Sequence, residues 1–134
     1  ITHVTFTSLS SALISGSSSP KVYHVSPDYL SWNDALTYCR THHKDLALIE
    51  SAGENTAAAN VSDGDKWIGL FRSTGKWSDN RAVAYTAWYH ELSGKKTYHE
   101  PCVHLYGSIW RTSSCGIRKA VCYSGEDLVF VAYK

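Results

Sequence analysis

The segment Trp67-Ile68-Gly69-Leu70-Phe71 is the part of the chain that most clearly predicts a β-strand. It joins aromatic and branched apolar side chains without a charged residue, a composition typical of a buried strand. Further strand-like runs follow at residues 76–79, 82–85, 102–106, 109–111 and 119–123. Turn residues separate the last three runs, and the polar stretch 89–101 is predicted to be a long loop. The chain from residue 67 onward is therefore expected to be mainly β-structure.

A first helix is predicted upstream of this β-rich part. Ser31 is followed three residues later by Asp34, which resembles a capping box at a helix N-terminus. Apolar side chains then recur with helical spacing at Trp32, Ala35, Leu36 and Cys39. Because these residues share one face of the helix, Cys39 is expected to point into the core.

A second helix is predicted after the apolar run 46–49. It begins with Ser51-Ala52-Gly53-Glu54, another capping signature, and continues through the alanine-rich stretch 56–61. The short run 22–25, ahead of both helices, is strand-like and ends at Ser26-Pro27-Asp28. The predicted order is thus one strand, two helices and then several strands.

Length and charge exclude several classes of protein. The chain has 134 residues and a hydrophobic fraction of 43%, which suits one compact domain with a substantial core. Thirteen Lys and Arg against twelve Asp and Glu give a net charge of +1, so no basic surplus favours nucleic acid as a partner. No apolar run reaches the length of about 18 residues that a membrane span needs, so insertion of this segment into a membrane is not expected.

The cysteines point to an oxidising compartment. The four cysteines include no pair with the C-x-x-C spacing of zinc or redox motifs, and the two nearest, Cys115 and Cys122, lie seven residues apart. Disulfides are the better interpretation, with three pairings open. Asn60-Val61-Ser62 is a sequon for N-glycosylation, so Asn60 is a possible glycan acceptor. We therefore predict an extracellular protein, either secreted or part of a receptor ectodomain.

The two ends of the chain differ from its middle. Residues 1–20 carry no charged side chain and include a serine-rich stretch, which fits a linker, a signal remnant or an edge strand. The chain contains no Met, so we expect a processed or excised piece of a longer protein. In the tail, residues 124–134, the run 128–131 resembles the run 22–25 that lies 106 positions earlier. This offset suggests the first strand of a following domain copy, and a terminal or exchanged strand of this same domain is the alternative.

Several landmarks occur together in one family. The helix segment 35–39, the run 45–49, Trp67-Ile68-Gly69-Leu70, Trp77-Ser78-Asp79 and the series Cys102, Trp110, Cys115 and Cys122 stand in its order and approximate spacing. Over residues 21–123 the chain resembles a C-type lectin-like domain, in the style of fish mannose-receptor-like proteins or secreted C-type lectins. The resemblance implies an α+β fold in which two helices flank antiparallel β-sheets and a long irregular loop presents the ligand surface. It also implies the disulfides Cys39–Cys122 and Cys102–Cys115.

The resemblance bears on calcium as well. Sugar-binding members hold this ion with a Glu-Pro-Asn or Gln-Pro-Asp triplet in the long loop, a later Glu, and an Asn-Asp pair after a strand Trp. Here Glu100 matches the later Glu, neither triplet is present, and Arg111-Thr112 follow Trp110. A guanidinium offers positive charge and no lone pair, so it opposes a calcium ion. We expect the sugar-site calcium to be lost, and no cofactor apart from an auxiliary calcium site that Glu50 and Glu54 could join, although Glu54 also fits a helix cap.

The prediction for function is a non-enzymatic recognition module that binds a glycan or a protein through its long loop without that calcium. The expected ligand-binding residues are Lys95, Lys96, Tyr98, Glu100, Arg111 and Thr112. One alternative is a calcium-dependent lectin with a rearranged ligand set around Glu100, and another is a structural spacer or oligomerisation module. Tandem copies or a homo-oligomer are the expected assemblies. The seven histidines show no recognised metal-ligand spacing, and no catalytic motif is present.

Overall fold

The computed structural model describes residues 14–71, 75–88, 102–126 and 128–132. The chain divides into two compact units, one made of residues 1–21 and 125–134 and the other of residues 22–124. No helix among the described residues is long and apolar enough to cross a membrane.

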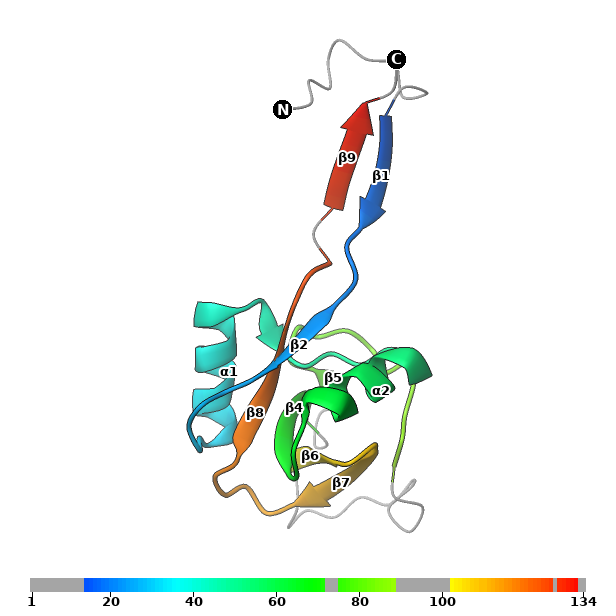
Figure 1. The fold of residues 1–134 in the computed structure, drawn as a ribbon. Helices are drawn as coiled ribbons and strands as arrows, with labels where there is room; N and C mark the ends of the chain where they lie inside the picture. Colours follow the sequence, from blue (N-terminus) through cyan, green and yellow to red (C-terminus); the bar gives the residue numbers. More distant parts are fainter. Residues whose placement is uncertain (1–13, 72–74, 89–101, 127, 133–134) are drawn as a thin grey trace. The chain divides into compact units, whose positions relative to one another are not determined.

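The larger unit is built on a seven-stranded sheet (Figure 1). Its main strands are β2 (Val22–Val25), β8 (Lys119–Ser124), β4 (Lys66–Phe71), β6 (Cys102–Tyr106) and β7 (Ile109–Ser113), in that spatial order. Two short strands join from the side, β3 (Asp45–Leu46) on β8 and β5 (Lys76–Trp77) on β4. The neighbouring strands are antiparallel except β4 and β8, which are parallel. The sheet is therefore mixed, whereas the family resemblance implied antiparallel sheets.

The two predicted helices are confirmed, together with their caps. Helix α1 (Trp32–His42) begins after Ser31, whose hydroxyl accepts a hydrogen bond from the Asp34 amide at 3.1 Å. Helix α2 (Ala52–Val61) begins after Ser51, whose hydroxyl accepts from the Glu54 amide at 3.1 Å. These side chains satisfy amide groups that the first helical turn leaves unpaired. Helix α1 packs on β3 and β8, and α2 lies against β2.

The core surrounds the central strand β4. Its Trp67, Ile68 and Leu70 are buried, together with Trp110 of β7. Cys39 of α1 is fully buried and forms a disulfide with Cys122 of β8, while Cys102 pairs with Cys115. Both disulfides implied by the family resemblance are therefore confirmed. They fit an oxidising compartment.

The predicted strand at 82–85 is wrong, and the one at 76–79 is shorter than expected. Only Ala82 forms an isolated bridge, to Lys76, and β5 ends at Trp77. Asn80 has a φ of 77°, a left-handed conformation that turns the chain at this point. Beyond the turn, Val83 and Tyr85 pack on the core with partly buried side chains. The strand-like composition of residues 82–85 thus reflects packing of an irregular segment on the core rather than pairing in a β-ladder.

The smaller unit contains a two-stranded antiparallel ribbon. Strand β1 (Ile14–Ser18) pairs with β9 (Leu128–Ala132), with Ile14 opposite Ala132 and Ser18 opposite Leu128. Beside the ribbon, the Glu126 amide donates to the Ser19 carbonyl at 2.9 Å, and Lys21 pairs with the Glu126 carboxylate at 3.2 Å. The serine-rich stretch and the apolar tail therefore pair with each other. Whether a further copy of the domain follows stays a prediction.

Candidate functional site

The segment 89–101, which contains most of the predicted ligand-binding residues, is held at both flanks on strand β7. On its N-terminal side Trp88 forms a parallel bridge with Trp110, and the Trp110 amide donates to the Ala87 carbonyl at 2.8 Å. On its C-terminal side Cys102 pairs with Ser113 in the β6–β7 ladder. Strand β7 therefore connects both ends of this segment.

Three aromatic side chains pack around Trp110 of β7. The rings of Trp77, Tyr85 and Trp88 each meet Trp110 edge to face, with centroid distances of 5.5, 6.0 and 5.7 Å. This is the favoured arrangement of aromatic quadrupoles. Trp77 and Trp110 are buried and Trp88 is partly buried. These residues therefore build a packed aromatic platform at Trp88, the described N-terminal flank of the segment 89–101, rather than a ligand surface.

The predicted ligand-binding residues divide into two groups. Lys95, Lys96, Tyr98 and Glu100 lie outside the described residues, so their roles stay predictions. Arg111 and Thr112 lie in β7, where side chains alternate between the two faces of the sheet. Thr112 points into the core and is only 8% exposed. Arg111 points to the opposite face, where its guanidinium lies 5.3 Å from the ring centre of Tyr106.

The described residues at the family's sugar site do not suit a calcium ion. Calcium takes about six to eight oxygen ligands, mostly carboxylates and carbonyls. Where the family places an Asn-Asp pair, Arg111 contributes a cation, and Thr112 contributes one neutral hydroxyl in a buried position. A carboxylate is therefore missing from both positions, and we derive no function through a calcium ion at this site.

The residues of the expected auxiliary calcium site are engaged by protein groups. The Glu54 carboxylate accepts a hydrogen bond from the amide of Glu50, one residue before the N-cap Ser51, at 2.7 Å, so it is engaged at the start of α2. The Glu50 carboxylate pairs with Arg81 at 3.1 Å, and Arg81 also pairs with Asp79 at 2.8 Å. The Arg81 guanidinium therefore supplies positive charge to the carboxylates of Glu50 and Asp79, and the auxiliary calcium site stays a prediction.

The described histidines occupy structural positions. His104 of β6 is 4% exposed, and its Nδ1 lies 3.2 Å from the Ser113 hydroxyl. Burial lowers the pKa of His104 to about 4, the charge of Arg118 adds to this effect, and the Asp65 carboxylate opposes it. His24 and His43 stack with their ring centroids 4.3 Å apart. Within the described ranges no three His, Cys, Asp or Glu residues are grouped so that they could hold a metal ion.

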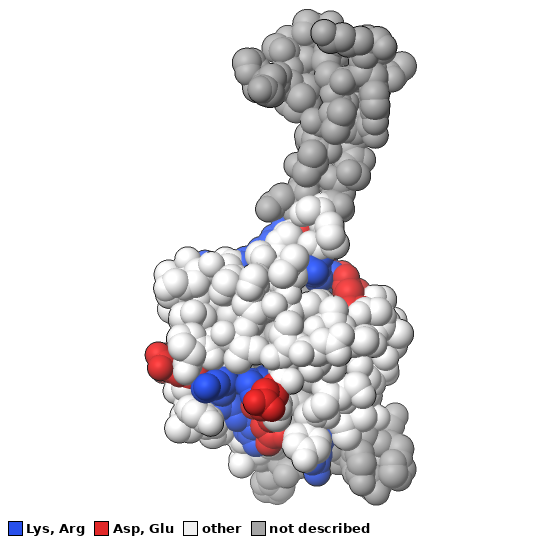
Figure 2. Space-filling model, viewed as in Figure 1, with Lys and Arg blue, Asp and Glu red and all other residues white. Residues whose placement is uncertain are grey.

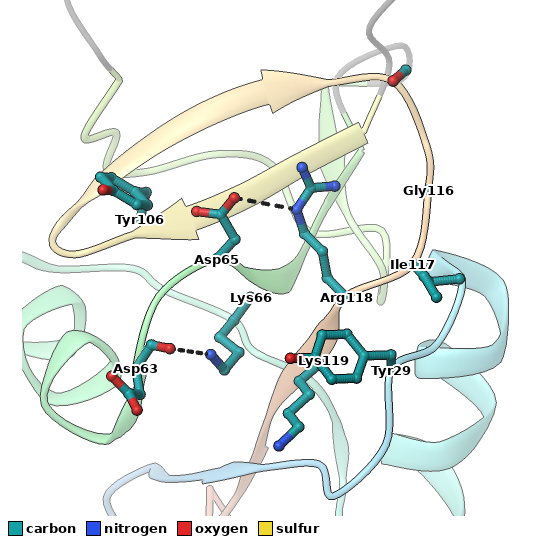
Figure 3. A pocket seen from close by; sticks show the side chains of 10 residues that line it. Tyr29, Asp63, Asp65, Lys66, Tyr106, Gly116, Ile117, Arg118 and Lys119 are labelled. Atoms are coloured by element: carbon teal, nitrogen blue, oxygen red, sulfur yellow. Dashed lines mark hydrogen bonds and ion pairs between the residues drawn. The ribbon is translucent and has the colours of Figure 1, made fainter.

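A hollow of about 570 Å³ opens on the larger unit, and its residues are absent from the sequence-based prediction (Figure 3). We call it the Lys66 hollow. Its lining residues are Tyr29, Asp63, Asp65, Lys66, Tyr106, Ser114, Gly116, Ile117, Arg118 and Lys119. In the sequence, this hollow is indicated only by the charged residues within 63–66 and by the adjacent Arg118-Lys119. Such groups of charged residues also occur in ordinary turns, so they do not predict a site. Only folding brings these distant segments together.

Comparisons with known proteins agree with this geometry. Residues 28–124 match the family model of the lectin C-type domain. The chain is 32% identical over 120 residues to Rheacalcin-2 of Rhea americana, covering 69% of this chain and 80% of that protein. It is 27% identical over 119 residues to P-selectin of Mus musculus, covering 78% of this chain but only 16% of that protein. The chain belongs to the C-type lectin domain family.

A solved structure shows the same fold. The mouse scavenger receptor C-type lectin carbohydrate-recognition domain superposes with a TM-score of 0.69 at 24% sequence identity. The superposition covers 80% of this chain and 92% of that domain. The fold implied by the family resemblance is thus confirmed.

Proposed function

We propose that this chain is a non-enzymatic, extracellular recognition module that binds a glycan or a protein ligand without the sugar-site calcium. The binding surface is the segment 89–101 together with the adjoining part of β7. Lys95, Lys96, Tyr98 and Glu100 of this segment contact the ligand, and Arg111 contributes from β7. A surface of cations and tyrosine suits a ligand with carboxylate, sulfate or acidic side-chain groups.

One observation carries this proposal. Trp88 is bridged to Trp110 and Cys102 is paired with Ser113, so both flanks of the segment 89–101 are tied to β7. The disulfide Cys102–Cys115 further restrains the C-terminal flank. Binding residues are commonly carried on loops that a rigid scaffold holds in position. The buried Trp110 cluster and this disulfide are such a scaffold.

The residues of β7 support binding without calcium. Arg111 and Thr112 supply neither a carboxylate nor an amide oxygen where sugar-binding members have an Asn-Asp pair. Without those ligands, a calcium-bridged contact with vicinal sugar hydroxyls lacks its basis. An Arg at this position instead favours direct bidentate contact with an anionic group.

The test is a binding screen on the purified chain, performed with glycans and with candidate proteins, in excess calcium and again in excess chelator. Its companion is the thermal unfolding midpoint under both conditions, because a ligand that binds only the folded state raises the midpoint. We expect binding and midpoint to be independent of calcium. Binding that disappears with chelator would instead support the calcium-dependent lectin built around Glu100.

A variant pair locates the binding surface. The double substitution Lys95→Ala and Lys96→Ala is expected to weaken binding about tenfold, which corresponds to a loss of about 1.4 kcal/mol of charge-assisted contact in total. Lys44→Ala is the matched control, because Lys44 is exposed and follows α1. Equal binding by both variants would refute the assignment to 89–101.

A further inference from the structure

We propose that the Lys66 hollow is a second binding site, which takes a short acidic saccharide, a sugar carrying a carboxylate or a sulfate. It involves none of the residues 89–101, and it does not depend on the function proposed above. The inference rests on the size of the hollow, on the placement of its charges and on two exposed aromatic rings.

The size of the hollow suits a small ligand. Its volume of about 570 Å³ lies within the range of about 300–1,000 Å³ that is typical of ligand pockets. It is assembled from six parts of the chain: the segment before α1, the turn before β4, the start of β4, the end of β6, the β7–β8 connection and the start of β8. The disulfide at Cys115 restrains the β7–β8 connection. The walls are therefore held by the sheet and by a covalent bond.

Positive charge exceeds negative charge in the lining, which has three cations, Lys66, Arg118 and Lys119, against two carboxylates, Asp63 and Asp65. The Asp65 carboxylate lies 3.7 Å from Arg118 and 3.8 Å from His104. Arg118 also lies over the ring of Trp67, 4.8 Å from its centre. Arg118 is therefore held by Asp65 and Trp67 and offsets part of the Asp65 charge, whereas His104, with its lowered pKa, is neutral near pH 7 and offsets none of it.

The two lysines provide the binding charge. Lys66 is only 6% exposed, and its ammonium donates to the Asp63 backbone carbonyl at 2.7 Å. Figure 3 shows the Asp63 carboxylate pointing away from that ammonium. Lys119 lies 5.5 Å from the ring centre of Tyr29, and no carboxylate pairs with it among the residues described. An anion between the two ammonium groups would offset their repulsion.

The surroundings of Lys66 disfavour its charged form. Burial lowers the pKa of Lys66, and the nearby charge of Lys119 lowers it further, while Asp63 and Asp65 raise it. A bound anion would restore the pKa of Lys66 toward its usual value, because an opposite charge favours the ammonium form. On the face of the molecule shown in Figure 2, basic and acidic side chains lie side by side within a mainly uncharged surface.

The remaining lining favours a sugar over an acidic peptide. Tyr29 is 66% exposed and Tyr106 is 49% exposed, and Figure 3 shows their rings on opposite sides of the hollow. Exposed tyrosine rings offer flat apolar faces to the C–H groups of a sugar ring and a hydroxyl at the edge. The carboxylates of Asp63 and Asp65 accept hydrogen bonds from sugar hydroxyls. They would repel a chain of several acidic groups, so a polyol with one anionic group fits best.

The test measures binding of three disaccharides to the full chain by NMR titration: one ending in glucuronic acid, one carrying a single sulfate and one neutral. Chelator is present throughout, which excludes calcium-dependent binding elsewhere. We expect saturable shifts of the amides of Tyr29, Tyr106 and Ile117 with the two acidic sugars and not with the neutral sugar. The relative affinities of the two acidic sugars identify the preferred anionic group. No saturable shift with either of them would overturn the proposal.

Two variants and a control complete the test. Lys119→Ala is expected to weaken acidic-sugar binding about tenfold, because a charge-assisted contact is lost. Tyr29→Ala is expected to weaken binding of the acidic sugars as well, since its exposed ring stacks on the sugar. Lys44→Ala should bind like the unchanged chain, and equal unfolding midpoints would show that all variants fold. Full binding by Lys119→Ala, or tighter binding of a sulfotyrosine peptide than of either sugar, would refute the saccharide site.

Discussion

The indole of Trp110 in β7 donates a hydrogen bond to the side-chain carbonyl of Asn55 in α2, at 2.8 Å and across 55 residues of sequence. The Asn55 amide group in turn donates to the Ser108 carbonyl at 2.7 Å. The buried side chain of Asn55 thus pairs both with the indole N–H of Trp110 and with the backbone carbonyl of Ser108, in the turn before β7. Because β7 connects the flanks of the segment 89–101, this contact joins α2 to the platform of the proposed binding surface.

Substitution of Asn55 should therefore destabilise the fold. Asn55→Ala leaves the buried Trp110 N–H without its acceptor, which costs about 1–3 kcal/mol. Asn55→Asp keeps the oxygen that accepts from Trp110, but it loses the N–H group that donates to Ser108 and places a carboxylate in a buried position, so it is destabilising as well. We expect Asn55→Ala to lower the free energy of unfolding by about 2 kcal/mol in chemical denaturation. Thr56→Ala, at the exposed neighbouring position, is the control and should change it little. An unchanged stability of Asn55→Ala would contradict this account.

Gly69 is required by a close approach of the backbone. A Cβ atom at this position would lie 2.9 Å from the Ala47 carbonyl and 2.9 Å from the Ser78 hydroxyl. Gly69→Ala is expected to cost about 1–3 kcal/mol of stability through overpacking. Adding Ser78→Ala should recover only part of the loss, because the Ala47 carbonyl stays in place. Full recovery in the double variant, measured by thermal unfolding, would show that Ser78 alone causes the conflict.

The stability of the protein should fall in mild acid because of His104. Its pKa is lowered to about 4 in the folded protein from the usual value of 6.5, mainly by burial. The unfolded chain therefore binds the proton more readily than the folded protein. The contribution of His104 to the free energy of unfolding is fully present above pH 6.5 and declines as the pH falls toward 4. The contribution amounts to about 3 kcal/mol at most.

The measurement is the unfolding midpoint between these pH values, compared between the unchanged chain and His104→Gln. The Gln side chain cannot titrate, so the variant should show a flatter pH dependence. Parallel curves would mean that carboxylates, rather than His104, cause the decline.

The two disulfides should differ in their contribution to stability. Cys39–Cys122 joins residues 83 apart and Cys102–Cys115 joins residues 13 apart. In the loop-entropy description these closures contribute about 4.5 and about 3 kcal/mol. We expect the Ser double variant of the first pair to melt at the lower temperature. The variant of the second pair should remain folded but lose ligand binding through 89–101, because the C-terminal flank of that segment is released. Retained binding would contradict the role assigned to this disulfide.

Much of the architecture could be predicted from local signals. Ser31 with Asp34 and Ser51 with Glu54 fix helix starts through contacts three residues apart, and such contacts are visible in any sequence. The burial of Cys39 followed from helical spacing. The prediction for the segment 82–85 failed because a strand-like composition was interpreted as a strand, whereas Val83 and Tyr85 pack on the core from a segment in which only Ala82 forms a bridge.

Local patterns in the chain were enough to define the helices, the central strand and, through family resemblance, both disulfides, because these depend on periodicity, capping and recognisable motifs. Three other relationships became visible only in the folded molecule: Arg111 faces Tyr106, Asn55 reaches Trp110, and Lys66, Arg118 and Lys119 line one hollow. These contacts join segments that are far apart in the chain. Their geometry depends on strand order and register. Local patterns do not predict these, because burial and pairing are established only when the whole sheet assembles.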